Sequence, residues 1–197
     1  MTESRKKSII KTLIIIGIIV GGLVGGFFIL CAACNTDTPI TVVEGNSMIP
    51  TLSQGDIIFL QKPRDLGDVQ NGSHTEKTGD ILVYYSSYLG FLVIHRVIDK
   101  KFENGTWYFN TQGDNDDLPD NQDIYHLPGD AYLPEDYVKG VMIGRIPWIG
   151  NIGIFLRDSG IGIFLIVIIL AYLIISSFFD SKSSKSDKKD DKKDENL

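Results

Sequence analysis

The sequence predicts a mostly β domain anchored by an N-terminal and a C-terminal transmembrane helix. Two apolar segments without charged side chains, residues 12–34 and 161–179, are each close to the roughly 20 residues that a helix needs to cross a bilayer. About 125 residues lie between them, enough for one compact domain. They form short β-branched or aromatic runs separated by turns, without a long helical period, which favours an all-β domain.

The N-terminal segment reads as a retained membrane anchor. Basic residues in 1–11 place this end of the chain in the cytoplasm by the positive-inside rule. A secretory signal peptide begins similarly, but its apolar region is shorter. Cys34 could be a lipidated cysteine, although Cys31 stands where a Leu-like residue is expected. A short bridge between Cys31 and Cys34 is a further alternative. Without another Cys for a metal site, we interpret them as small apolar residues at the membrane boundary.

The central region, predicted as the catalytic β domain at 38–150, contains six expected strands. Glu103-Asn104-Gly105 between two of them is a hairpin turn signal. Arg64–Thr78 is a polar loop, interpreted as an excursion from the core, and 115–136 is a second irregular stretch. The expected strands are Ile40–Val43, Asp56–Gln61, Ile81–Tyr85, Phe91–Asp99, Trp107–Gln112 and Val138–Ile146.

The C-terminal part returns the chain to the membrane. Residues 151–160 contain a short amphipathic run that suits the interface, and the second span is expected at 161–179. Residues 180–197, rich in Ser, Lys and Asp, are expected to be a disordered cytoplasmic tail. Two spans place both termini in the cytoplasm and the β domain outside. The net charge of −6 does not suggest a nucleic-acid partner.

Ser47 is the candidate nucleophile, because Gly45 and Asn46 precede it and Pro50 follows closely, which constrains the backbone on both sides. A hydroxyl nucleophile needs a base, and His95 ends an apolar run that would hold it on a strand.

Each other candidate also has a structural interpretation. A single His on a strand is often structural, and Asp114 could cap its own turn. The aspartates after Gly113 do not fit a calcium loop, because Leu118 and Pro119 occupy key positions. His74 and His126 lie in polar loops and are interpreted as solvated. We predict neither a metal nor a cofactor.

Five motifs in order resemble the type I signal peptidases, most closely their archaeal and endoplasmic-reticulum branch. The likeness runs from about Val42 to Gly150, and the motifs together are far more specific than the first alone. They are Ser-Met-Ile-Pro-Thr-Leu from Ser47, Gly-Asp-Ile-Ile-Phe from Gly55, Gly-Asp-Ile-Leu-Val from Gly79, Ile-His-Arg-Val from Ile94, and Gly-Asp-Asn from Gly113 with Asp120 trailing.

The resemblance implies a Ser-His-Asp site. Ser47 would be the nucleophile and His95 the base, whereas the other bacterial branch has a Lys at the place of His95. Family spacing makes Asp120 the residue that orients His95, with Asp114 in support. Gly45 departs from the family, which often has a Ser there whose hydroxyl helps bind the oxyanion. The oxyanion site would then rest on the backbone N–H of Ser47 and Asn46.

The implied activity is that of a membrane-bound serine endopeptidase that removes signal peptides from exported preproteins after small residues. The substrate would pair as a strand near Thr41–Glu44 and Leu92–Ile94, with pockets from Val43, Met48 and Ile94. The implied partners are preproteins, the lipid bilayer and the protein-export channel. The implied location is the cell membrane, which the chain would cross more than once, with the catalytic domain on the extracytoplasmic side. The alternatives are a processor of a few dedicated substrates and a non-enzymatic docking subunit. The Gly45 departure is the only support for a docking subunit, and the presence of Ser47, His95, Asp114 and Asp120 argues against it.

Overall fold

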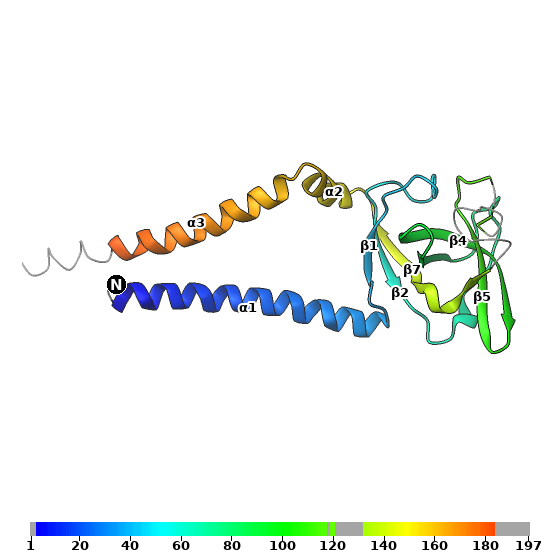
Figure 1. The fold of residues 1–197 in the computed structure, drawn as a ribbon, viewed down its shortest axis with the longest axis horizontal. Coiled ribbons are helices and arrows are strands. Elements are labelled where there is room, and N and C mark those ends of the chain that lie inside the picture. Colours follow the sequence, from blue (N-terminus) through cyan, green and yellow to red (C-terminus); the bar gives the residue numbers. More distant parts are fainter. Residues whose placement is uncertain (1–2, 118, 121–131, 184–197) are drawn as a thin grey trace, which may run out of the picture. The chain divides into compact units, whose positions relative to one another are not determined.

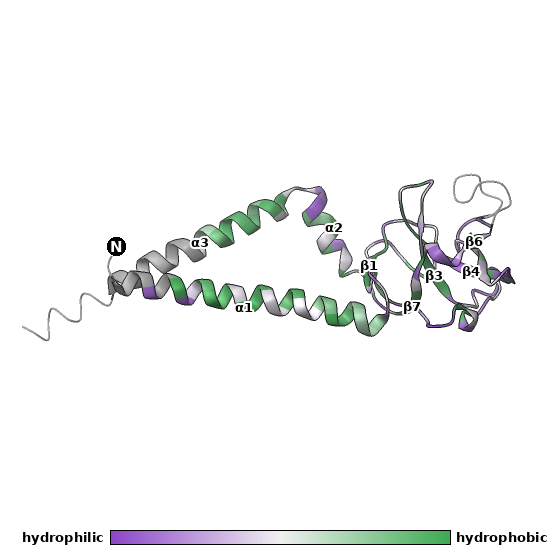
Figure 2. Ribbon diagram, turned by 60° about the horizontal axis from the view of Figure 1, so that its bottom comes forward, coloured by the Kyte–Doolittle hydropathy of each residue, from purple (hydrophilic) through white to green (hydrophobic). Residues whose placement is uncertain are grey.

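The apolar N-terminal stretch forms one continuous helix, α1 (Glu3–Cys34), in the structure, a computed structural model that describes residues 3–117, 119–120 and 132–183. Most of its residues are apolar, as the hydropathy colouring of the ribbon shows (Figure 2). Its segment Ile10–Cys34 is, by length and composition, long and apolar enough to cross a membrane. Cys31 and Cys34 are free thiols near its end.

The C-terminal region is also helical, but it forms two helices rather than one straight helix. α2 (Gly150–Asp158) and α3 (Ile161–Ser183) meet at a bend of 90°. They count as a second candidate span only if the bent pair is taken as one crossing. α3 takes in residues 180–183 of the expected tail, and 184–197 lie outside the described residues.

The residues between the helices form one antiparallel seven-stranded sheet with the order β1-β2-β7-β3-β4-β5-β6 (Figure 1). The mostly β prediction is therefore confirmed. The strands are β1 (Ile40–Val42), β2 (Ile57–Gln61), β3 (Ile81–Ser86), β4 (Phe91–Glu103), β5 (Thr106–Gln112), β6 (Leu133–Pro134) and β7 (Val138–Ile146). The connections include two short 3-10 turns, η1 (Leu66–Asp68) and η2 (Glu135–Tyr137).

The last strand of the chain lies in the middle of the sheet. β7 pairs with β2 on one side and with β3 on the other. It thereby joins the β1–β2 pair to the β3–β4 hairpin. The sheet is completed by the part of the domain that is synthesised last.

The strand β4 changes its partner along its length. Phe91–Arg96 pairs with β3, whereas pairing with β5 begins only at Arg96. The predicted hairpin turn joins β4 to β5, and Asn104 and Gly105 have positive φ angles of 53° and 83°, as a type I′ turn requires. Residues 91–95 of β4 therefore pair with β3 along one edge. Along the other edge they have no strand partner among the described residues.

The hydrophobic core lies on both faces of the sheet. Leu82 and Tyr84 of β3 belong to one cluster and Ile81 and Val83 to the other, so β3 is buried along nearly its whole length. A strand covered on both faces needs apolar residues in sequence rather than in alternation.

Two expectations about the loops are corrected. Arg64–Thr78 is not an excursion from the core, because Leu66 and Val69 are buried in the first cluster and Lys100 donates hydrogen bonds to the Gly67 and Val69 carbonyls. His74 is half-buried rather than solvated, with its Nε2 atom enclosed and without a partner among the described residues. His126 lies outside the described residues.

Candidate active site

Ser47 lies on the loop that follows β1, and its neighbours fix the loop to the core. Met48 and Leu52 are buried in the second cluster, and the Leu52 N–H donates to the Met48 carbonyl at 2.8 Å. The Ser47 carbonyl accepts a hydrogen bond of 2.7 Å from the Asn115 N–H. The serine is thus attached to the turn after β5 as well as to its own loop.

His95 lies on β4, opposite Leu82 of β3, and is 2% exposed. Its Nε2 atom is 3.0 Å from Ser47 Oγ. Its Nδ1 atom is 2.8 and 2.7 Å from the two carboxylate oxygens of Asp120. Because a carboxylate only accepts, Nδ1 carries a proton, and Nε2 is within hydrogen-bond distance of the Ser47 hydroxyl.

Asp120 is 1% exposed and is held by several donors. Besides His95, the Tyr84 hydroxyl donates to its Oδ2 atom at 2.9 Å, and the Thr111 hydroxyl donates to the same oxygen. Its own N–H donates to the Thr111 carbonyl at 2.7 Å. These contacts give the buried carboxyl group hydrogen-bond partners and fix its orientation toward the imidazole.

Asp114 is set apart from this chain of contacts. Its two oxygens accept from Arg96 Nε at 2.7 Å and Arg96 Nη2 at 2.8 Å, a bidentate pair in which both residues are buried. The Thr51 hydroxyl also donates to Asp114, and Lys77 donates to its carbonyl. Asp114 therefore joins the serine loop, β4 and the loop before β3.

The pKa of Asp114 reflects these opposing influences. Burial raises it, but the hydrogen bonds from Arg96 and Thr51 and the charge of Arg96 outweigh burial and hold the pKa below its ordinary value. The Asp114 carboxylate is consequently ionised at neutral pH.

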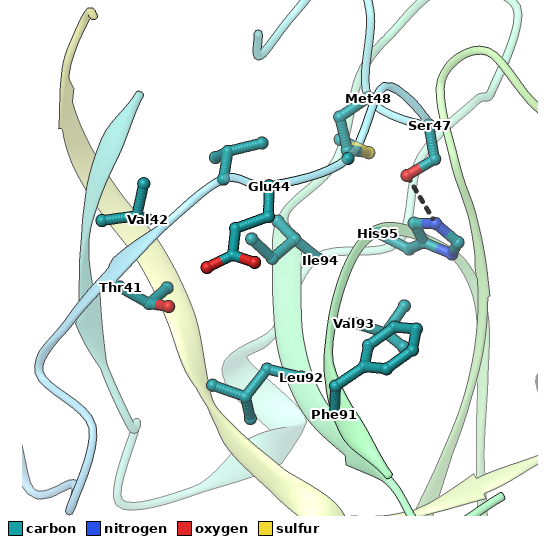
Figure 3. Close-up of a pocket in the computed structure, with 12 residues that line it drawn as sticks. Thr41, Val42, Glu44, Ser47, Met48, Phe91, Leu92, Val93, Ile94 and His95 are labelled. Carbon is teal, nitrogen blue, oxygen red and sulfur yellow. Dashed lines mark hydrogen bonds between the residues drawn. The ribbon is translucent and has the colours of Figure 1, made fainter. Parts of the chain in front are cut away.

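An apolar groove of about 510 Å³ ends at the Ser47–His95 pair (Figure 3). One wall is the chain from Thr41 to Met48 and the other is Phe91–His95 of β4. Val43, Met48 and Ile94, the three residues expected to form substrate pockets, all line it. Val43 and Met48 are buried and Ile94 is half-buried.

The expected oxyanion donors are the backbone N–H groups of Ser47 and of Asn46, the residue before it. None of the described residues accepts a hydrogen bond from the N–H of Ser47 or of Asn46. Gly45 lines the groove, and a Cβ atom added to it would meet nothing within 4 Å. Within the described part of the chain, no cluster of His, Cys, Asp and Glu side chains could hold a metal ion.

Sequence reasoning did not assign several residues that the structure brings to the site. Arg96, Tyr84 and Thr111 support the two buried carboxylates. Asp116 Oδ2 lies 3.4 Å from His95 Nε2. Arg96 carried a signal, as a charged residue that follows His95 directly after the apolar run 91–94.

Comparison with known proteins found a consistent group of relatives, although no family model matches the chain. The signal peptidase complex catalytic subunit sec11 of Dictyostelium discoideum is 28% identical over 143 residues, 72% of this chain and 74% of the relative. The SEC11 subunit of Fusarium vanettenii is 30% identical over 130 residues, 66% and 70% of the two chains. That of Eremothecium gossypii is 29% identical over 144 residues, 72% and 80%.

Proposed function

Because this chain belongs to the family of signal peptidase complex catalytic subunits, the endoplasmic-reticulum-type branch of the type I signal peptidases, we propose that it is a membrane-bound serine endopeptidase that removes signal peptides from preproteins. The observation that carries this proposal is the chain of contacts from Ser47 Oγ through His95 to Asp120. A serine, an imidazole and a carboxylate in this order are the parts that acyl transfer requires.

In the proposed mechanism, Ser47 Oγ attacks the scissile carbonyl carbon while His95 Nε2 takes the hydroxyl proton. Asp120 keeps the ring in the required tautomer and balances the imidazolium charge that develops. His95 then gives the proton to the leaving amine, and water repeats the sequence to release the acyl group. The backbone N–H groups of Ser47 and Asn46 are the proposed donors to the oxyanion, because neither donates a hydrogen bond to another described residue.

The groove is the proposed place of the cleavage region. Among the described residues, β1 pairs only with β2, and residues 91–95 of β4 pair only with β3. An extended substrate can therefore add its backbone to these edges. Val43 and Met48 close the groove next to Ser47, which supports a preference for small side chains before the cut.

We also propose that the chain crosses the membrane twice, with both termini in the cytoplasm, residues 38–150 outside and residues 151–160 at the interface. The exposed apolar side chains of Ile149, Ile152 and Phe155 around α2 support the interfacial placement. Its preproteins would reach the site from the protein-export channel. The topology is tested by adding a protease to intact cells that carry a tag at either terminus. Both tags should be protected, and cleavage of the C-terminal tag from outside the cell contradicts the topology.

The activity is tested by cleavage of a preprotein in liposomes, with wild type, Ser47→Ala, His95→Ala and Asp120→Ala. Loss of cleavage in all three, with unchanged thermal unfolding of Ser47→Ala, is the expected result. An inactive wild type, or a Ser47→Ala variant as active as wild type, favours a docking subunit without activity. A panel of many preproteins then distinguishes a general peptidase from a dedicated one.

A further inference from the structure

A second carboxylate faces the imidazole from the side of the nucleophile. Asp116 Oδ2 lies 3.4 Å from His95 Nε2, the same nitrogen that is 3.0 Å from Ser47 Oγ. Its side chain is 34% exposed, whereas that of His95 is 2% exposed. The proposed mechanism gives this carboxylate no role, because Asp120, which contacts Nδ1, is the carboxylate that orients the ring.

The turn that carries Asp116 is firmly attached to the site. The Asp116 N–H donates to the Gly113 carbonyl at 3.1 Å, and the Gln112 side-chain amide donates to the Asp116 carbonyl at 2.8 Å. Asn115, between them, donates its N–H to the Ser47 carbonyl. A Cβ atom on Gly113 would lie 2.1 Å from Asp116 Oδ2 and 2.8 Å from the Ser47 carbonyl oxygen. The carboxylate is therefore packed into place next to the catalytic pair.

Asp116 lies beyond the groove. The groove is lined by residues 41–48 and 91–95 and ends at Ser47 and His95, without Asp116 (Figure 3). When the residues before the scissile bond occupy the groove, the residue after it must leave past the catalytic pair. The amine of that residue receives its proton from His95 Nε2, the atom that Asp116 approaches.

We propose that Asp116 is a specificity-determining residue on the leaving-group side, which selects against an acidic residue directly after the cleavage site. This inference rests on the proposed function. A carboxylate this close to the first residue of the mature protein repels a second carboxylate there, and it attracts the amine that is released. We expect about a tenfold loss of kcat/KM for an acidic residue, which corresponds to about 1.4 kcal/mol.

The experiment compares two preproteins that differ only directly after the cut, one with Gln and one with Glu, which has the same shape. Both are cleaved in detergent by wild type, Asp116→Asn and Asp117→Asn. The control Asp117→Asn removes an equal charge from the exposed neighbouring side chain. We expect wild type and Asp117→Asn to prefer the Gln substrate about tenfold, and Asp116→Asn to prefer it less than twofold.

The wild type alone provides a second measurement, which does not depend on the folding of a variant. Its preference for the Gln substrate should weaken in 1 M salt, where the Debye length is about 3 Å. Equal cleavage of both substrates by the wild type overturns the inference and leaves the proposed function intact. A full preference in Asp116→Asn, or one that salt does not change, also overturns it. Failure to cleave either substrate overturns both proposals.

Discussion

In the variant Asp114→Asn, a buried carboxylate is exchanged for an amide of the same shape beside the Arg96 guanidinium. The carboxylate accepts two hydrogen bonds from Arg96, at 2.7 and 2.8 Å, and the exposed fractions of Arg96 and Asp114 are 3% and 4%. Removing one partner of such a pair costs about 3–5 kcal/mol of the free energy of unfolding. Because the amide oxygen still accepts one hydrogen bond, we expect about 3 kcal/mol.

The pH dependence of this loss follows from the lowered pKa of Asp114. A carboxyl group whose pKa is lower in the folded state contributes stability that is complete above its unfolded pKa of about 4. That contribution is lost as the pH falls through the folded pKa. The difference in Tm between wild type and Asp114→Asn should therefore be constant from about pH 6 to 8 and shrink below about pH 4.

The assay is thermal unfolding in detergent, followed by circular dichroism at several pH values. For a domain of this size, 3 kcal/mol corresponds to a decrease in Tm of about 10 °C. Asp136→Asn is the matched control, because it removes the same charge from an exposed side chain on η2. A decrease of less than about 2 °C, or one that persists unchanged at low pH, would refute the reasoning.

Three further variants test the rest of the site. Gly45→Ser should raise kcat by about tenfold to a hundredfold by adding an oxyanion donor, since its Cβ meets no neighbour; an unchanged kcat contradicts this. Tyr84→Phe removes a donor to Asp120 and should lower the unfolding free energy by about 1.5–3 kcal/mol, which denaturant titration measures; no change means that this hydrogen bond contributes nothing. Gly113→Ala should lower kcat by about a hundredfold, because its Cβ would lie 2.8 Å from the Ser47 carbonyl oxygen; wild-type kinetics would show that the turn can move without effect.

The strands were predictable because their residues have a local preference that the sheet satisfies. All six expected strands are present, and Asn104-Gly105 forms the expected turn. β6 was not predicted, because two residues that include Pro134 carry no strand signal of their own. It exists only through pairing with Tyr108 and Phe109 of β5, which no local pattern reveals.

The burial of the Arg64–Thr78 loop also could not be predicted from local composition. Its polar residues indicate a surface segment, but Leu66 and Val69 are buried in the core and Lys100 donates hydrogen bonds to two of its carbonyl groups. A few apolar residues in a polar loop become informative only when the strands around them are known.

For the site, the sequence singled out Ser47, His95, Asp114 and Asp120, and the structure brings Ser47, His95 and Asp120 into contact. The structure places Asp120 against His95 and Asp114 against Arg96. The residues alone do not separate the two aspartates, because both follow β5 within eight residues of its end, and only the family resemblance pointed to Asp120. Asp116 was considered only as a calcium ligand, since its approach to His95 depends on how the turn folds back over Ser47.

The central position of β7 has a consequence for the order of events during synthesis. Ser47 lies on the loop between β1 and β2, and His95 belongs to the hairpin β3–β4. β7 is the strand that joins these two parts of the sheet. Until residues 138–146 have been synthesised, no strand joins these two parts of the sheet. Under the proposed mechanism, the sheet that holds Ser47 and His95 together is therefore complete only after nearly the whole domain has been made.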